Sequence, residues 1–310
     1  MLNPSGTPNV RLRWFNGFCA SVGYGLSLLA GLLFLAFFLT HVAPGDPARI
    51  ILGANAREDS VQALRSEMGF DRPLLRQFTD YSWRLLSGRW GNSWLARRPV
   101  LAEIGEHLGP TIRIGIVAVL FALGTAIALN ACFFWIPHLR WIVNVTRFGV
   151  AIPGVVLAMG GALLASRWSS GLSIEKFSFV PGVSAGLYTS CLITSLLSDR
   201  LSQIEASSAF RATEALGFGR FHIFNRVLLS NARSLLTTLC VNQLGLIFFS
   251  TIIVEQIFSI RGLGALLVRS IQGKDLPVIS AILLLNGVFF LVVHFFQAKG
   301  TSSQFREVPI

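Results

Sequence analysis

The chain has 310 residues, of which 53% are hydrophobic and 13% are charged. Soluble domains carry charge on about a quarter of their residues, so this composition excludes an ordinary soluble enzyme or binding module and indicates a membrane protein. The formal net charge of +11 comes from basic residues dispersed along the chain, whereas a nucleic-acid surface would need them gathered on one soluble face.

Six uncharged apolar windows are long enough to cross a bilayer. A transmembrane helix needs roughly 20 residues, because each residue adds about 1.5 Å and the helix must satisfy its own backbone polar groups. The windows are residues 17–40, 114–137, 148–166, 177–198, 234–254 and 277–297. The third contains Pro153 and Gly154, so its bounds are the least defined. The sequence therefore predicts an all-α membrane protein with six transmembrane helices.

Both ends of the chain are expected on the same side of the membrane. Arg11 and Arg13 precede the first window, whose apolar run is too long for a secretory signal and instead predicts an uncleaved anchor. With residues 1–16 inside, the inside connections carry more Lys and Arg than the short outside ones. This places residues 1–16, the connection 199–233 and the tail 299–310 in the cytoplasm.

Residues 41–110 form a long connection that would lie outside the membrane. It begins with Ala43-Pro-Gly-Asp46-Pro47, in which two prolines and a glycine end the first helix. Apolar residues at helical spacing in 61–64 and 74–86 predict two or three short helices. Three tryptophans suit the membrane interface: Trp83, Trp90 and Trp94. The segment is either a platform for an extracytoplasmic partner or an amphipathic collar that seals the helix bundle.

The connection 199–233 is polar, although it lies between two apolar windows. It contains Phe210-Arg-Ala-Thr-Glu-Ala-Leu-Gly217-Phe-Gly-Arg220, which predicts a short helix, a glycine break and a basic rim. A loop of this kind suits docking onto a soluble partner. The alternative is a solvated basic loop beside anionic lipid.

Motifs for catalysis and cofactor binding are weak. A phosphate-binding P-loop needs Lys followed by Ser or Thr, and the three lysines precede Phe, Asp and Gly. Gly182-Val-Ser184-Ala-Gly186 matches the nucleophile elbow of serine hydrolases, but the same glycines suit close helix packing in an apolar window. The four cysteines and five histidines are scattered, so the sequence predicts no metal site, no catalytic residue and no bound cofactor.

Two other function classes compete with a transporter subunit. An ion-coupled secondary transporter would need intramembrane carboxylates, and the six windows contain no Asp or Glu. An intramembrane serine hydrolase would need a partner for Ser184, for which His294 is the candidate. The other role open to His294 is a position on a translocation path.

Three groups of motifs carry a resemblance to a known family. They are Phe38-Leu-Thr-His-Val-Ala-Pro-Gly-Asp46-Pro47; Gly69-Phe-Asp-Arg-Pro-Leu-Leu-Arg-Gln77-Phe with Gly88-Arg-Trp-Gly91-Asn-Ser93; and Val254-Glu255-Gln-Ile-Phe-Ser-Ile-Arg-Gly262-Leu-Gly264 with Asp275-Leu-Pro277-Val278. Over residues 30–295 the chain closely resembles the dipeptide, oligopeptide and nickel permease family of ABC importers. The resemblance implies the first, B-type membrane subunit, with the type I importer permease fold, in a bacterial inner membrane.

The resemblance also implies a set of partners. A permease of this family pairs with a second homologous permease, two cytoplasmic ATP-binding subunits and an extracytoplasmic solute-binding protein. ATP and Mg²⁺ would therefore be bound by partner chains, and this chain would be a transporter subunit and not an enzyme. Membrane lipid is a further expected partner, and nucleic acid is not expected.

By resemblance, the connection 199–233 is the EAA loop, whose helix lies in a cleft of the ATPase. Arg211, Ala212, Gly217, Leu229 and Asn231 match the family pattern, whereas Thr213 and Ser230 depart from it. The expected coupling residues are Phe210, Arg211, Ala212, Glu214, Ala215, Gly217, Phe218 and Arg220. Among them, the two phenylalanines would be apolar anchors and the two arginines would pair with acidic groups.

On the outer side, residues 255–264 follow the fifth window directly. They are expected to form a re-entrant turn at the mouth of the path or to pack against the outer helices. The expected gate or binding-protein contacts are Asp46, Glu255, Arg261, Gly262 and Gly264. The substrate stays open among peptides, nickel, metal–metallophore chelates and antimicrobial peptides, although the scarcity of metal ligands in the windows argues against a bare-metal path.

Overall fold

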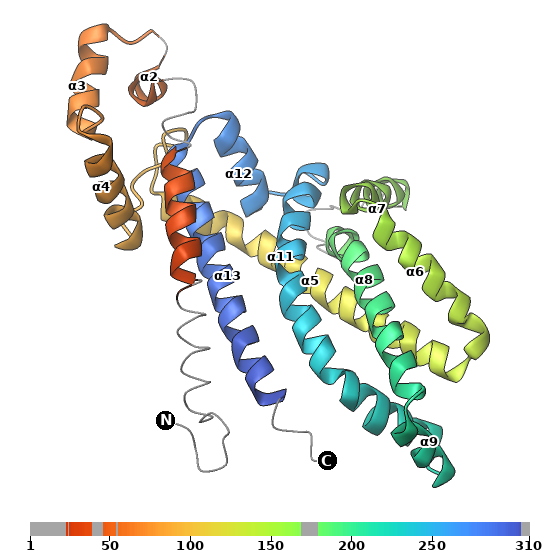
Figure 1. The fold of residues 1–310 in the computed structure, drawn as a ribbon. Coiled ribbons are helices and arrows are strands. Elements are labelled where there is room, and N and C mark those ends of the chain that lie inside the picture. The colour runs from red at the N-terminus through yellow and green to blue at the C-terminus, as the bar shows by residue number, and fades with distance from the viewer. Residues whose placement is uncertain (1–22, 24, 39–45, 54, 169–178, 305–310) are drawn as a thin grey trace, which may run out of the picture. The chain divides into compact units, whose positions relative to one another are not determined.

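The computed structural model describes residues 23, 25–38, 46–53, 55–168 and 179–304 (Figure 1). Within these residues the regular elements are helices, and an isolated bridge pairs Asn92 with Pro99. The all-α class predicted from the sequence is confirmed for this part of the chain. The chain divides into two compact units: unit 1 is Met1–Gly109 with Ala265–Val292, and unit 2 is Pro110–Gly264 with Val293–Ile310.

Unit 1 contains an apolar helix over Gly25–Phe38 and three short helices before the first long one. The short helices are α2 (Pro47–Leu52), α3 (Glu58–Met68) and α4 (Leu74–Leu86). Its other elements are the start of α5 (Val100–Trp135), most of α12 (Leu263–Gln272) and the first part of α13 (Leu276–Gln304). The prediction of two or three short helices between the first two windows is therefore confirmed.

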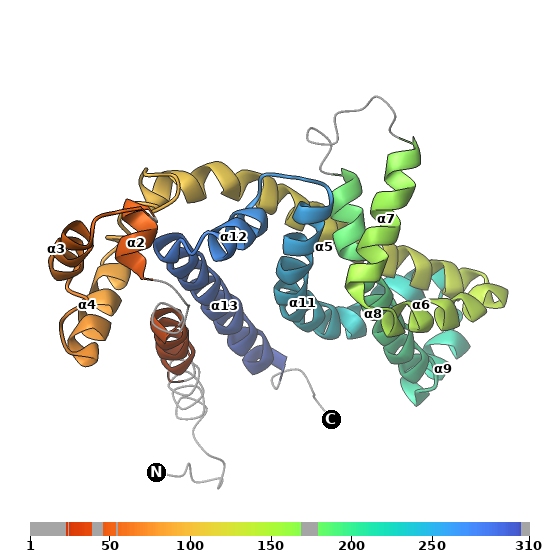
Figure 2. The ribbon, with the colours of Figure 1, turned by 90° about the horizontal axis from the view of Figure 1, so that it is seen from above.

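Unit 2 contains the rest of α5 and the helices that follow it. They are a 3₁₀ turn (Pro137–Trp141), α6 (Ile142–Ala151), α7 (Gly154–Trp168), α8 (Phe179–Glu205), α9 (Ser208–Ala215), α10 (Arg220–His222), a π-helical turn (Ile223–Leu229) and α11 (Ser230–Ile257). Figures 1 and 2 show α8 flanked by α11 on one side and by α6 and α7 on the other. The helix α8 is therefore the centre of this unit.

In the part of the chain that the structure describes, three helices are long and apolar enough to cross a bilayer by length and composition: α5, α8 and the Leu276–Val293 part of α13. Two bent pairs, Pro137–Ala151 with Gly154–Gly161 and Leu235–Gly245 with Ser250–Ile257, raise the number to five if each pair is one span. The first window is only partly covered, because residues 17–22, 24 and 39–40 lie outside the described residues. The six-span topology stays a prediction.

The third window does not form one straight helix, so the expected span 148–166 is wrong in its bounds. The helix α6 ends at Ala151, α7 begins at Gly154, and the bend between them is 105°. Pro153 is the physical reason, because proline disfavours helical dihedrals at the residue before it, and Ile152 is extended with ψ 126°.

The long helices extend into both predicted connections. The helix α5 begins at Val100, so its first turns lie inside the predicted connection 41–110. The helix α8 continues to Glu205, α9 follows at Ser208, and helical structure begins again at Arg220, so the connection 199–233 is mostly helical. In both places the helix runs past its apolar window into charged sequence. At the start of α5, the acidic residue Glu103 lies in the first turn, where it complements the helix dipole.

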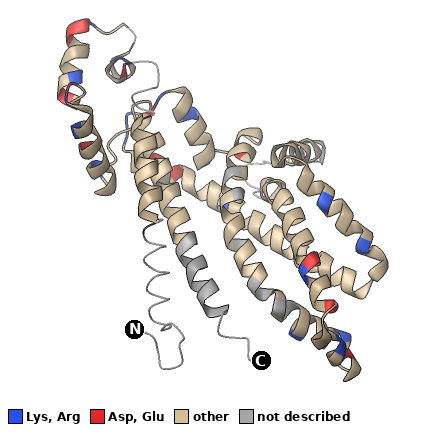
Figure 3. Cartoon of the chain, in the orientation of Figure 1, with Lys and Arg blue, Asp and Glu red and all other residues tan. Residues whose placement is uncertain are grey.

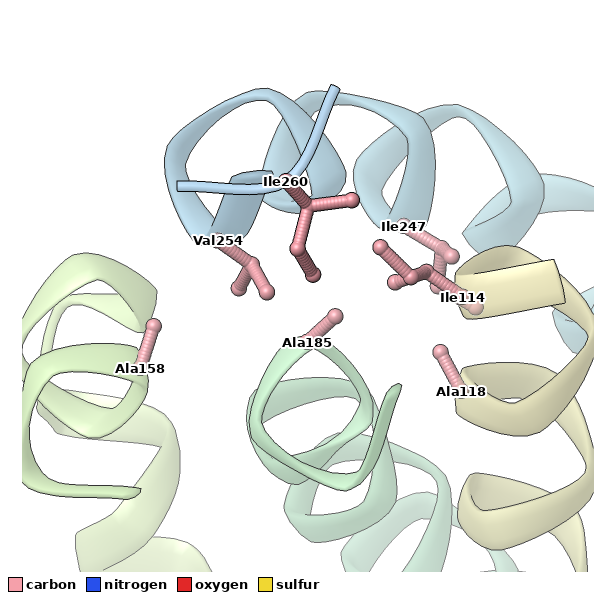
Figure 4. Packing of buried hydrophobic residues seen from close by; sticks show 7 residues of the cluster. All are labelled: Ile114, Ala118, Ala158, Ala185, Ile247, Val254 and Ile260. Carbon is pink, nitrogen blue, oxygen red and sulfur yellow. The ribbon is translucent and has the colours of Figure 1, made fainter. Parts of the chain in front are cut away.

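Small residues set the packing of unit 2. Figure 4 shows the buried cluster of Ile114, Ala118, Ala158, Ala185, Ile247, Val254 and Ile260. A Cβ added at Gly186 of α8 would lie 2.6 Å from the Ala118 carbonyl oxygen of α5. The two backbones therefore approach closely, as the Gly-x-x-x-Gly spacing predicts. Ser184 is buried against Gly161 of α7, which favours the packing interpretation of this motif over a nucleophile elbow.

Polar side chains also join α5 to α8. The hydroxyls of Thr125 and Ser190 lie 2.6 Å apart, and the Asn130 amide donates to the Thr194 carbonyl at 3.2 Å. Hydrogen bonds of this kind hold helices together where water is excluded. They fix the register of α8, whose far end carries the candidate site.

Candidate functional site

The predicted short helix and glycine break are present after α8. Ser207 begins the segment as the N-cap of α9, and its hydroxyl accepts from the Phe210 N–H at 3.3 Å. The helix α9 ends at Ala215, and Gly217 follows with φ +78°, a left-handed conformation that glycine adopts without strain. The sequence prediction of a glycine-terminated helix is confirmed at this point.

Phe210 does not offer its ring to a partner, which corrects the expectation of an exposed anchor. Its side chain is buried in a cluster formed by α8, α9, the π-helical turn and α11, with Leu197, Leu201, Ile223, Phe224, Leu228 and Ala232. The sequence pattern of so short a helix does not determine which of its apolar residues faces the interior. Phe210 therefore holds α9 against its own unit.

Three other apolar side chains are exposed around the glycine break. Leu216 is 76% exposed, Phe221 67% and Phe218 47%. The Phe218 ring stacks on His222 with centroids 5.0 Å apart, which orients it. Phe218 is among the residues predicted from the sequence, whereas Leu216 and Phe221 are not, although both lie close to the glycine break.

The remaining predicted coupling residues border these apolar side chains. Arg211, Ala212, Glu214, Ala215, Gly217 and Arg220 are all exposed. Arg211 also reaches back to the Ala206 carbonyl at 3.4 Å. Figure 3 shows Lys, Arg, Asp and Glu near α9, whereas most of α8 carries other residues. The exposed Leu216, Phe218 and Phe221 with Arg211 and Arg220 are called the α9 rim below.

Two ion pairs brace the base of this segment. Arg140 in the 3₁₀ turn pairs with Glu205 at 2.7 Å, and Arg147 of α6 pairs with Asp199 at 2.5 Å. Both pairs are at least partly exposed, so each adds little free energy. Their geometric effect is to connect the 3₁₀ turn and α6 to the C-terminal end of α8, from which the α9 rim follows.

Among the predicted gate or binding-protein contacts, Glu255 is fully buried at the end of α11. Its carboxylate accepts from the Thr111 hydroxyl at 2.6 Å, and the same hydroxyl accepts from the Leu263 N–H at 2.8 Å. A Cβ at Gly262 or Gly264 would overlap the carboxylate or the Ile252 backbone. Glu255 is therefore not exposed for a direct contact with a binding protein in this conformation, and its role at a gate stays a prediction. The two glycines allow close packing around its carboxylate.

Two further predicted gate or binding-protein contacts, Arg261 and Asp46, differ in exposure and in their partners. Arg261 is exposed at the tip of the turn between α11 and α12. Asp46 caps α2 by accepting from the Ala48 N–H at 3.1 Å, and it pairs with Arg65 of α3 at 3.1 Å. Within this set, Arg261 is exposed and its contact with a partner stays a prediction, whereas Asp46 stabilises unit 1.

Unit 1 holds two buried carboxylates that sequence reasoning did not select as site residues. Asp275 accepts from the Ser93 hydroxyl at 2.5 Å and from the backbone N–H groups of Trp94 and Leu95. Glu103 near the start of α5 pairs with Arg98 at 2.7 Å and lies 3.6 Å from Arg269. The Asp275 carboxylate is occupied by three donors of its own unit, and the Glu103 carboxylate is neutralised by the nearby arginines Arg98 and Arg269.

The same region contains a fork-shaped ion pair. The two Nη atoms of Arg98 donate to the two carboxylate oxygens of Glu106 at 2.8 and 2.7 Å. Among the described residues, no group of three His, Cys, Asp or Glu side chains could hold a metal ion.

Comparison with known proteins decides the family. Residues 121–298 match the family described as binding-protein-dependent transport system inner membrane component, and residues 21–106 match the N-terminal part of such membrane components. The first match covers more than half of the chain. This chain belongs to that family of ABC importer permeases. Permeases of the family lack an ATPase site, and partner subunits hydrolyse ATP.

Curated relatives of this permease are glutathione transport proteins. The glutathione transport system permease protein GsiC of Salmonella typhimurium is 29% identical over 290 residues, which cover 88% of this permease and 94% of the relative. GsiC of Escherichia coli K12 is 28% identical over 270 residues, which cover 84% and 88% of the two chains. The family resemblance inferred from the motifs is thus confirmed, and the permease is not an enzyme.

Proposed function

We propose that this chain is the permease subunit of an ATP-driven, binding-protein-dependent importer of short peptides, with glutathione-like tripeptides as its substrate class. The observation that carries the proposal is the similarity to glutathione permeases over nearly the whole of both chains. Nickel is less well supported, because no group of metal ligands gathers among the described residues. A metallophore chelate would need no such ligands and is the second candidate.

The working complex in this proposal has two related permeases, two cytoplasmic ATPases and one extracytoplasmic binding protein. The two permeases would each line half of the translocation path. Both termini would be cytoplasmic, in a bacterial inner membrane, with the α9 rim on the same side.

The α9 rim is proposed to be the contact with the ATPase. Its apolar members, Leu216, Phe218 and Phe221, have the character of side chains that fill pockets at an interface. Arg211 and Arg220 would pair with acidic groups at the border of that interface. Phe210, Ala212, Glu214, Ala215 and Gly217 would shape and hold α9, so that movement of the ATPase passes to α8 and α11 as a rigid displacement.

Uptake by cells tests the substrate class. The gene for this chain would be deleted and restored, and accumulation of labelled glutathione, a dipeptide and nickel would be measured. The proposal predicts that restored cells accumulate glutathione or the peptide, and that unlabelled peptide competes while nickel does not. Accumulation of nickel alone would contradict the peptide assignment.

A further inference from the structure

The helix α4 has a wider apolar surface than unit 1 covers. Successive residues of a helix are about 100° apart, so positions 75, 79, 83 and 86 lie on one flank. On this flank Leu75 is 77% exposed, Trp83 69% and Leu86 54%. The adjacent face, with Phe78, Tyr81 and Leu85, packs into the unit. Arg76, Asp80 and Arg84 occupy the remaining side of the helix. An apolar arc that is only half covered, followed by a basic side, is typical of a helix at a membrane interface.

The position of α4 along the apolar helices of unit 1 indicates how deep it lies. The ring centroids of Phe78 and Phe37 are 5.3 Å apart, whereas Leu85 packs with Leu33 and Leu284. The helix α4 thus runs antiparallel to Gly25–Phe38, and the two lie side by side in Figures 1 and 2.

Leu284 fixes the depth of the C-terminal end of α4. It is eight positions (284 − 276) beyond the start of the candidate span Leu276–Val293, or about 12 Å along a helix. The hydrocarbon layer is about 30 Å thick, so Leu284 lies well inside a span of this length. The end of α4 therefore lies beside this candidate span and not above it.

The C-terminal end of α4 satisfies its own carbonyl groups, as a helix end must where water is scarce. The Ser87 and Arg89 N–H groups donate to the Trp83 and Arg84 carbonyls, both at 2.9 Å. The Trp90 indole donates to the Leu85 carbonyl at 3.0 Å. Gly88, with φ +75°, permits this tight ending.

The polar side chains of α4 are consistent with the same depth. Arg84 Nε donates to the Asp80 carbonyl at 3.3 Å, so its side chain extends back along the helix toward the N-terminal end. That end lies nearer the level of Phe37, at the border of the apolar helices. This is how an arginine keeps its charge in the headgroup layer while its stem lies against apolar surface.

We infer that α4 is a lipid-binding helix: its Leu75, Trp83 and Leu86 flank contacts acyl chains of the outer leaflet, and Arg76 and Arg84 bind phospholipid phosphate groups. The occupant is bilayer phospholipid, because the flank is apolar at the depth of the spans and its border is basic. The site is independent of the transported solute, and only the name of the leaflet rests on the proposed topology.

A photoactivatable amino acid at position 86 tests the occupant. The complete importer would be reconstituted in vesicles that contain phosphatidylglycerol and phosphatidylcholine, and the crosslinked partner would be identified by mass. The inference predicts crosslinks to phospholipid from position 86 and few from Gln62, an exposed residue of α3. Crosslinks from position 86 mainly to another protein subunit, or mainly to water, would overturn it.

The arginines provide a second measurement. Each basic residue near an anionic surface contributes about 1 kcal/mol, so Arg84→Gln should reduce the preference of position 86 for phosphatidylglycerol over phosphatidylcholine about fivefold. Arg57→Gln, an exposed arginine before α3, is the matched control and should leave the preference unchanged. Equal preference in the Arg84→Gln and Arg57→Gln proteins would contradict phosphate binding by Arg84.

Discussion

Ser93 Oγ donates a hydrogen bond of 2.5 Å to Asp275 Oδ2, although 182 positions separate the two residues in the sequence. The Asp275 carboxylate also accepts from the N–H groups of Trp94 and Leu95, at 3.1 and 3.3 Å. One buried side chain therefore joins the connection before α5 to the turn before α13. Two motifs that the sequence shows far apart form one structural unit.

Replacement of Asp275 by Ala should destabilise unit 1. It removes the acceptor for one hydroxyl and two backbone donors, and each buried donor left without a partner costs about 1–3 kcal/mol. Asp275→Asn should cost less, because one carbonyl oxygen remains. Thermal unfolding of the purified permease in detergent measures both effects, with Gln62→Ala on exposed α3 as control. An unfolding temperature for Asp275→Ala equal to that of the control would show that these bonds contribute little.

Gly262 and Glu255 should be energetically coupled. When Glu255 is present, a Cβ added at position 262 overlaps its carboxylate, so Gly262→Ala should destabilise the turn after α11. In a Glu255→Ala background the methyl group finds space, so the same substitution should cost less. A double-mutant cycle of unfolding free energies should give a coupling of about 1 kcal/mol or more. Gly160→Ala, where an added Cβ meets no atom within 4 Å, is the control; strictly additive effects at 255 and 262 would refute the packing explanation.

Substitutions at Phe210 and Leu216 should distinguish a loss of stability from a loss of coupling to the ATPase. Phe210→Ala removes a buried ring and should lower stability by about 3–5 kcal/mol in the region around α9. Leu216→Ser changes an exposed side chain and should alter stability by less than about 0.5 kcal/mol, yet it should abolish stimulation of the partner ATPase by substrate-loaded binding protein. Unfolding and ATP hydrolysis are measured on the same preparations. If Leu216→Ser leaves full stimulation, the α9 rim is not the ATPase contact.

Substitutions at Gly217 should act through backbone conformation alone. An added Cβ meets no atom within 4 Å, but φ +78° is costly for other residues by about 1–2 kcal/mol, least for Asn. Uptake should therefore decrease from the unsubstituted protein through Gly217→Asn and Gly217→Ala to Gly217→Val. Gly219, whose φ is −63°, provides the control, because Gly219→Ala should be tolerated. Equal uptake by the Gly217→Val and Gly219→Ala proteins would leave the left-handed turn without a function.

The sequence predicts the helical class, most apolar segments and the glycine that ends α9, because these follow from composition and local conformational preference. It does not predict the orientation of α9. Phe210 and Phe218 look equivalent in the sequence, yet Phe210 is buried and Phe218 is exposed, because the π-helical turn and α8 supply a cluster for only one of them. Side-chain burial in a short helix depends on neighbours distant in sequence.

The carboxylates illustrate the same limit. Glu255 is expected at a gate or a binding-protein contact, but Thr111, Gly262 and Gly264 enclose it. Asp275 and Ser93 belong to motifs that the sequence identifies, whereas their mutual hydrogen bond depends on how unit 1 folds. The break at Pro153 could be anticipated from proline chemistry, but the size of the bend could not.

The most direct test of the central claim is solute accumulation in vesicles that contain this permease, its partner permease, the ATPases and the binding protein. We expect ATP-dependent uptake by the complete system, no uptake by this chain alone, and loss of uptake in Arg211→Glu and Phe221→Asp proteins that still insert and assemble their membrane subunits. Sustained accumulation by this chain alone, or full uptake by the Phe221→Asp protein, would contradict the claim that force from ATP hydrolysis enters through the α9 rim.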